Sequence, residues 1–170
     1  MNIFVTSESP VKSAQVLPDK HIVKMPLECC QMLSIVASSK WGHDYGVLPR
    51  QDGKPYRTNH GAFRNHPCTL WASAHPANAQ WLIEHAFALC EEYTARFGKE
   101  HTCYPTIVAA SRIFPQCDSV DHTPFARAMP EEYKYDDTIT TFEAYMMYLA
   151  SKPWLADNYR RIPTRRPEWV

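Results

Sequence analysis

The chain has 170 residues and a formal net charge of zero, with 18 Lys and Arg residues against 18 Asp and Glu residues. This balance disfavours a strongly basic DNA-coating protein but leaves room for a local basic groove. A hydrophobic fraction of 45% is enough to bury a core, which excludes a chain disordered by composition. We therefore expect a single compact domain over residues 1–170.

The first forty residues predict one short strand and two helices. Residues 2–6 are rich in Ile, Phe and Val, which favour an extended segment or strand. The Ser-Pro pair at 9–10 is typical of a helix start and begins a helix that ends near residue 17. Asp19 can cap a second helix that runs to about residue 39, in which Pro26 should produce a kink or mark the true first turn.

Four further helices follow, most of them beginning at a proline, and Gly98 should end the longest one. They are predicted at about 67–73, 76–97, 105–113 and 138–151. One short strand and about six helices predict an all-α, or nearly all-α, domain.

The N-terminus and the six cysteines bear on the compartment. We see no signal peptide, because no basic region is followed by a long apolar stretch, and no apolar run approaches the ~20 residues that a membrane span requires. We expect a protein that is cytoplasmic (in the host cytoplasm if a phage encodes it), contacts no membrane and keeps its cysteines reduced. No cysteine pair has zinc-finger spacing, so neither a metal nor a cofactor is predicted.

Three polar residues of the second helix, His21, Lys24 and Glu28, are the catalytic candidates. Their spacings of three and four place them on one face of a regular helix, apart from its apolar stripe. A lysine against an apolar site can lose its proton and attack an electrophilic sugar carbon. A carboxylate beside it can transfer a proton or stabilise positive charge on a sugar ring. The alternative is an amphipathic helix with an ordinary Lys24–Glu28 ion pair.

Residues 41–66 form a long irregular stretch with several basic side chains. Ordered loops of this length are uncommon unless they are functional or mobile. The stretch is either a surface excursion with solvated charges or a flap that binds a phosphate backbone. Asn65 or His66 can also cap the helix that begins at Pro67. Together with Lys20 and Arg161, the candidate DNA-binding residues are Arg57, Asn59, His60, Arg64, Asn65 and His66.

The helix over 76–97 carries a further group of polar residues. A carboxylate-histidine metal site is conceivable there, since His85 and Glu92 are seven residues apart and share a face. A solvated helix face is favoured, because surface glutamates are ordinary. The group consists of Glu84, His85, Glu91 and Glu92.

The C-terminal tail interleaves basic and aromatic residues. Such mixing suits nucleic-acid contact, in which arginines bind phosphates and aromatic rings stack on bases. The alternative is a C-terminal strap packed by its tryptophans. The residues are Lys152, Arg160, Arg161, Arg165 and Arg166 with Trp154, Tyr159 and Trp169. No glycine-rich phosphate loop and no GxSxG motif is present, which disfavours kinase, Rossmann and hydrolase functions.

Several segments together resemble a known family. They are DKHIVKM at 19–25 with Glu28 and QML at 31–33, NHPCTLWA at 65–72, LCEEY at 89–93, RFGK at 96–99, TPF at 123–125 and AMP at 128–130. On these segments the chain resembles small phage and bacterial proteins grouped with the pyrimidine dimer DNA glycosylases of the T4 endonuclease V type.

The resemblance implies a compact helical fold that extrudes a nucleotide and acts at its glycosidic carbon. It also implies an N-terminal α-amine nucleophile exposed by Met removal, an assisting Glu, for which Glu28 is the best match, and a lyase step through a Schiff base. Asn2 departs from this pattern, because it is too large for efficient Met removal. The nucleophile can therefore be the Met1 amine, Lys20, Lys24 or an external amine.

Three functions remain open. The first is a DNA glycosylase, with or without lyase activity, acting on a damaged or modified pyrimidine, whose extrusion explains aromatic residues beside basic loops. The second is a phage transferase that attaches an amino acid or amine to an activated hydroxymethyl pyrimidine in DNA. The third is a non-enzymatic nucleotide or protein binder in phage counter-defence. For an enzyme, the expected partner is double-stranded DNA bearing the altered pyrimidine, bound by a monomer.

Overall fold

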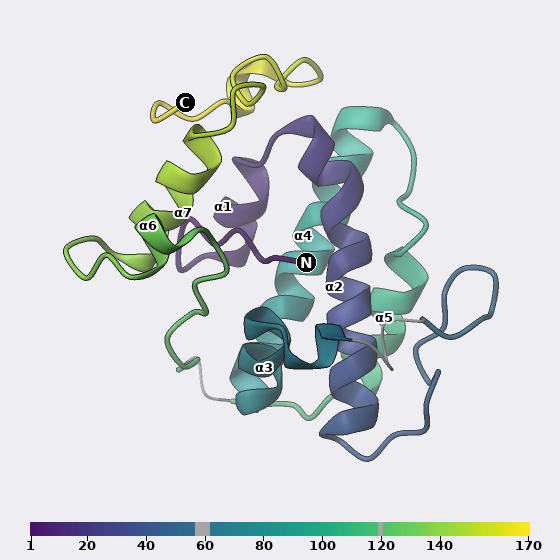
Figure 1. Ribbon diagram of the computed structural model, residues 1–170. Coiled ribbons are helices and arrows are strands. Elements are labelled where there is room, and N and C mark those ends of the chain that lie inside the picture. Colours follow the sequence, from purple (N-terminus) through teal and green to yellow (C-terminus); the bar gives the residue numbers. More distant parts are fainter. Residues whose placement is uncertain (57–61, 119–120) are drawn as a thin grey trace.

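The computed structural model describes residues 1–56, 62–118 and 121–170, and within them the chain is helical (Figure 1). The α-helices are α1 (Pro10–Gln15), α2 (Asp19–Ser39), α3 (Pro67–Ala74), α4 (Pro76–Phe97), α5 (Tyr104–Ile113), α6 (Glu131–Lys134) and α7 (Thr141–Ala150). Two 3₁₀ helices are η2 (Ala62–Asn65) and η3 (Pro163–Arg165). The prediction of a mostly helical protein is confirmed, and α4 has the predicted bounds.

The predicted strand at residues 2–6 is wrong, since the described residues contain no strand. The backbone N–H groups of Ile3 and Phe4 donate to the side-chain Oδ1 of Asn2, at 2.8 and 3.0 Å, rather than to a neighbouring strand. Phe4 also has a φ of 43°, which interrupts an extended backbone. The side chain of Asn2 therefore replaces the ladder that the apolar pattern suggested.

Helix α2 differs from its prediction at its start. Pro18 occupies the N-cap position and Asp19 is the first helical residue, so Asp19 is not the cap. The Asp19 carboxylate instead accepts hydrogen bonds from the backbone N–H groups of Arg160 and Arg161. Pro26 lies inside α2 rather than in its first turn. The helix continues through Pro26 because its apolar stripe is fully packed on neighbouring helices.

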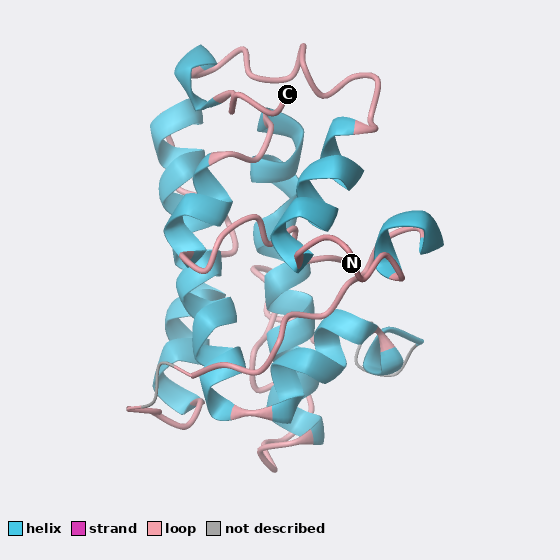
Figure 2. Cartoon of the chain, turned by 90° about the vertical axis from the view of Figure 1, so that its left-hand side faces the viewer, coloured by secondary structure: helices cyan, strands magenta, loops and turns pink. Residues whose placement is uncertain are grey.

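The core forms between the two long helices, α2 and α4, which pack against each other, with α1, α3 and α5 around them (Figure 1). The predicted stripe of α2 is buried: Ile22, Met25, Cys29, Met32, Leu33 and Val36. The N-terminal segment crosses the middle of this bundle in both views, so that the first residues lie beside α2 (Figure 2). No helix of the described residues is long and apolar enough to cross a membrane.

The polar group on α4 is divided: Glu84 and Glu91 are exposed, as favoured, whereas His85 and Glu92 do not lie on a solvated face. His85 is fully buried, and its Nδ1 pairs with the carbonyl of Pro10 at 2.9 Å. Glu92 is also buried and binds the guanidinium groups of Arg96 and Arg165. His85 is covered by α1 and Glu92 by the C-terminal tail, whereas both would be exposed on an isolated α4. Within the described ranges, no three His, Cys, Asp or Glu side chains gather to hold a metal ion.

The C-terminal tail packs against the bundle as a strap. Arg165 lies 2.7 Å from Glu92, and the hydroxyl of Tyr159 donates to the carbonyl of Val16 at 2.6 Å. The guanidinium of Arg161 lies over the ring of Phe97, 5.0 Å from its centroid. These contacts join residues about 60 to 140 positions apart and tie the strap to α4 and to the end of α1.

Candidate active site

Glu28, in the third turn of α2, is a buried carboxylate with two amines beside it. Its side chain is 8% exposed. Oε1 lies 3.0 Å from Nζ of Lys24, and Oε2 lies 3.7 Å from the α-amine of Met1. An acid and two amines thus meet at one point, although Met1 and Glu28 belong to separate segments.

The two amines differ in their surroundings. The side chain of Lys24 is 65% exposed, so its ammonium group reaches Glu28 from solvent. The side chain of Met1 is only 1% exposed, whereas the residue as a whole is half-buried. The part of Met1 that meets solvent is therefore its main chain, which carries the α-amine.

A cavity of about 230 Å³ lies over this group of residues. It is lined by Met1, Asn2, Phe4, His21, Lys24, Met25, Glu28, Tyr148 and Lys152. Three of these, His21, Lys24 and Glu28, are the predicted catalytic stripe, so the structure brings all three to one cavity.

His21 forms one aromatic wall of the cavity. Its ring stacks on Phe4 at 4.5 Å between centroids and meets the edge of Trp154 at 5.6 Å. Burial, and after it the positive charges of Lys152, Lys24 and Lys20, lower the pKa of His21 to about 4. His21 is therefore a neutral imidazole at neutral pH.

His66 adjoins the same site from the start of α3. Its Nδ1 accepts a hydrogen bond from the backbone N–H of Cys68 at 3.2 Å, so it is the predicted cap of that helix. Burial lowers the pKa of His66, the α-amine of Met1 lowers it as well, and Glu28 opposes both. His66 does not line the cavity, but α3 contacts the site one turn further on, where Oγ1 of Thr69 donates to the sulfur of Met1.

A family model described as pyrimidine dimer DNA glycosylase matches residues 1–105, more than half of the chain. The chain belongs to the pyrimidine dimer DNA glycosylase family. This confirms the resemblance read from the sequence. No curated protein and no solved structure matches the chain. The matched segment of this glycosylase-family protein, residues 1–105, includes Met1, Lys24, Glu28 and His66.

The other predicted DNA-binding residues of the family member are dispersed. Lys20 is beside the cavity, with Nζ 4.6 Å from the ring centroid of Trp154. Arg64 and Asn65 are exposed on η2, and Arg161 lies over Phe97 and does not line the cavity. Arg57, Asn59 and His60 lie outside the described residues.

Sequence reasoning missed two lining residues of this glycosylase-family site, Phe4 and Tyr148, and grouped Lys152 with the tail rather than with Glu28. Lys152 lies with Nζ 4.1 Å from the ring centroid of Tyr148. Both residues lie in or just after α7, outside the family match, and more than 100 positions from Glu28. Local spacing carries no signal for such a pair. The mixture of basic and aromatic residues in the tail was the one available hint.

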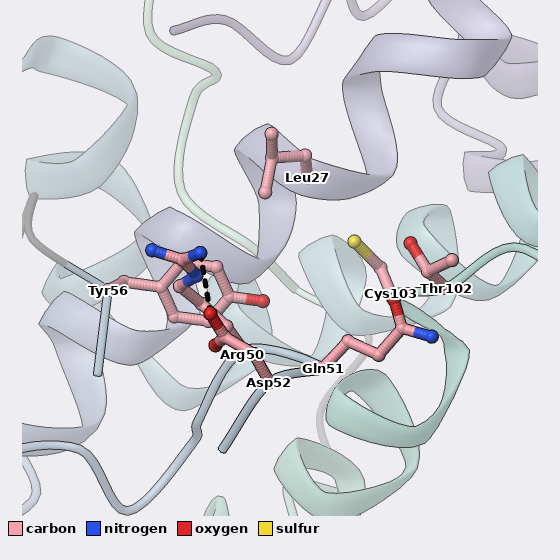
Figure 3. Close-up of a pocket in the computed structure, with 7 residues that line it drawn as sticks. All are labelled: Leu27, Arg50, Gln51, Asp52, Tyr56, Thr102 and Cys103. Atoms are coloured by element: carbon pink, nitrogen blue, oxygen red, sulfur yellow. Dashed lines mark hydrogen bonds and ion pairs between the residues drawn. The ribbon is translucent and has the colours of Figure 1, made fainter. Parts of the chain in front are cut away.

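A second cavity of about 210 Å³ lies between α2 and the start of α5, with Cys103 in its wall (Figure 3). On its rim, the guanidinium of Arg50 forms an ion pair with the carboxylate of Asp52, with 2.8 Å between nitrogen and oxygen. Both ring nitrogens of His101, beside this cavity, have hydrogen-bond partners. Nδ1 accepts from the backbone N–H of Cys103, and Nε2 pairs with the carbonyl of Val23. This cavity therefore offers no free acid-amine pair like that of Glu28.

Proposed function

We propose that this protein is a DNA glycosylase that removes a damaged or modified pyrimidine, with the α-amine of Met1 as nucleophile and Glu28 as its proton acceptor. The observation that carries the proposal is the 3.7 Å approach of the Met1 α-amine to Oε2 of Glu28, at a cavity large enough for part of an extruded nucleotide. Family membership gives the reaction class.

The proposed reaction begins when Glu28 takes a proton from the α-amine. The nitrogen lone pair attacks C1′ of the sugar, the glycosidic C–N bond breaks, and the base leaves with the bonding electrons and gains a proton. Opening of the sugar ring gives a Schiff base between the protein and C1′. Water hydrolyses it and leaves an abasic site. In the lyase branch, loss of a proton from C2′ expels the 3′ phosphate first.

Two considerations favour Met1 over the lysines as nucleophile. An α-amine is ordinarily a weaker base than a lysine side chain, so a larger fraction of it is neutral at pH 7. Lys24 is mostly exposed and Lys20 lies over Trp154, whereas the α-amine is held at the cavity by the buried side chain of Met1. An amine used as a nucleophile benefits from a fixed position.

Borohydride trapping tests this proposal. Duplexes carrying a pyrimidine dimer or an abasic site are incubated with the protein and sodium borohydride, and the cross-linked peptide is mapped by mass spectrometry. We expect a covalent adduct on the Met1 α-amine, retained in Lys24→Arg and lost in Glu28→Gln. An adduct on Lys24 would replace Met1 as the nucleophile. Absence of any adduct and of base release from lesion-bearing duplexes would contradict the glycosylase itself.

A second candidate function has one observation in its favour. The pKa of His21 is lowered by the positive charges of three nearby lysines, Lys152, Lys24 and Lys20. Such a cluster of lysines could hold a leaving pyrophosphate. In a transferase, an external amine would bond to the methylene carbon of an activated hydroxymethyl pyrimidine as the C–O bond breaks, with Glu28 taking the proton. Mass spectrometry of nucleosides after incubation with modified DNA separates this reaction from base release.

A further inference from the structure

Asn2 is buried between the proposed nucleophile and the rest of the protein. It is 7% exposed, yet every polar atom of its side chain has a partner. Oδ1 accepts from the N–H groups of Ile3 and Phe4 at 2.8 and 3.0 Å, and Nδ2 donates to the carbonyl of Ala128 at 2.7 Å. One amide thereby fixes the first four residues and anchors them to a segment 126 positions away.

The backbone that Asn2 stabilises has an unusual conformation. Phe4 has a φ of 43°, a region that bulky L-residues rarely adopt. Such conformations persist only where surrounding contacts hold them. Here these contacts are the hydrogen bond to Asn2 Oδ1 and the stacking of Phe4 on His21 at 4.5 Å. The turn at Phe4 brings the chain start back to α2 instead of leaving it extended.

Met1 is built into the same arrangement. Its side chain is 1% exposed and packs against the core. Its sulfur accepts a hydrogen bond from Oγ1 of Thr69 at 3.3 Å. If Met1 were removed, this anchor would be lost and the new α-amine would begin about 3.8 Å further along the chain, the spacing of consecutive Cα atoms. The amine would then leave its position beside Glu28.

We infer that Met1 is retained in the working protein and that Asn2 is a positioning residue that holds the Met1 α-amine at Glu28. The catalytic role of Asn2 rests on the proposed function, whereas the retention of Met1 and the fixed position of its α-amine do not. Asn2 has two effects that agree: its size disfavours Met removal, and its amide fixes the amine that is thereby kept. Asn2 lines the cavity, but its amide is committed to Ile3, Phe4 and Ala128, so it acts on the reaction through Met1.

The test uses Asn2→Gln, with Asn78→Gln as a matched control. Gln keeps the amide and is large enough to retain Met1, but its extra methylene moves the amide away from Ile3 and Phe4. Asn78 is also buried, and its amide likewise bonds three partners: the Trp71 carbonyl, Thr123 Oγ1 and the Thr123 N–H. Both substitutions disturb the hydrogen bonds of a buried side-chain amide. Only the amide of Asn2 lies next to the Met1 α-amine.

Three readouts are expected. Intact mass shows Met1 present in the wild type. Labelling of the Met1 α-amine by an acylating reagent, followed by peptide mass spectrometry, becomes at least about fivefold faster in Asn2→Gln and stays unchanged in Asn78→Gln. The single-turnover rate of Schiff-base trapping falls at least about tenfold in Asn2→Gln, with duplex affinity within about twofold, as expected when a nucleophile is misplaced.

Each other outcome is informative. Loss of Met1 from the wild type overturns the inference. Equal labelling in Asn2→Gln and the wild type also overturns it, as does an equal fall of trapping in both variants, since Asn2 would then be merely structural. If the wild type traps nothing, the proposed function fails, while mass and labelling still decide whether Asn2 holds a retained Met1 in place.

Discussion

Lys24 Nζ lies 3.0 Å from Oε1 of Glu28 on successive turns of α2, yet the two side chains are 65% and 8% exposed. The lysine therefore reaches down from solvent to a carboxylate that the fold has buried. Removing the exposed partner of such an ion pair costs the protein little stability, because water takes its place. The buried partner has no such substitute except the α-amine of Met1.

This difference predicts unequal effects of two substitutions. Lys24→Ala should change the free energy of unfolding by only a few tenths of a kcal/mol, the usual value of an i,i+4 pair. Glu28→Gln keeps the shape of the side chain but removes the proton acceptor, so single-turnover base release should fall by about 10²–10⁴-fold. Urea denaturation and quenched-flow assays measure the two effects. Full activity of Glu28→Gln would exclude Glu28 from catalysis.

The buried guanidinium of Arg96 predicts a large effect on stability. It is fully buried and donates to the carbonyls of Gln15 and Leu17 and to the carboxylate of Glu92. Arg96→Ala leaves the two carbonyls without this partner and leaves Glu92 with Arg165 alone, so unfolding in urea should become about 3–5 kcal/mol more favourable. Arg165, which is 34% exposed and binds the same Glu92, is the control. Arg165→Gln should cost about 1 kcal/mol or less; equal losses would contradict this account.

Two buried histidines predict that the protein loses stability in acid. Burial lowers the pKa of His21 and of His85 from 6.5 to about 4. Between these values the unfolded chain binds more protons than the folded one, so the free energy of unfolding falls as the pH drops from 6.5 towards 4. The slope should reach up to about 1.4 kcal/mol per pH unit for each histidine. Urea titrations from pH 4.5 to 7 should show a smaller slope in His85→Gln than in the wild type, and an unchanged slope would contradict the prediction.

The hydroxyl of Tyr145 predicts a link between α7 and the N-terminus. It donates to the carbonyl of Ala126 at 2.7 Å and accepts from the N–H of Ala128 at 3.2 Å, and Ala128 in turn anchors Asn2. Tyr145→Phe removes the hydroxyl partner of two half-buried backbone groups, which should cost about 1–3 kcal/mol in thermal or urea unfolding. Tyr135→Phe, at a side chain 65% exposed, should stay within about 0.5 kcal/mol. Similar effects at both positions would count against a specific role of the Tyr145 hydroxyl.

Several features of the fold were predictable because they depend on neighbours in the chain. The proline at the start of α4 and Gly98 at its end gave its bounds, since caps act within one turn. The same reasoning offered Asn65 or His66 as the cap of α3, and His66 is the cap in the structure. It failed at residues 2–6, where a segment rich in Ile, Phe and Val suggested a strand and the side chain of Asn2 took the backbone hydrogen bonds instead.

The sequence by itself determined the α-helices other than α6, the family and the His21-Lys24-Glu28 face of α2, because helical periodicity and local motifs need no partner from elsewhere in the chain. Only the tertiary structure decided which of these groups became buried and which amine met Glu28. Met1 reaches α2 through the turn at Phe4, and Lys152 arrives from beyond α7. Burial and charge at the site depend on packing between distant segments, which no local spacing records.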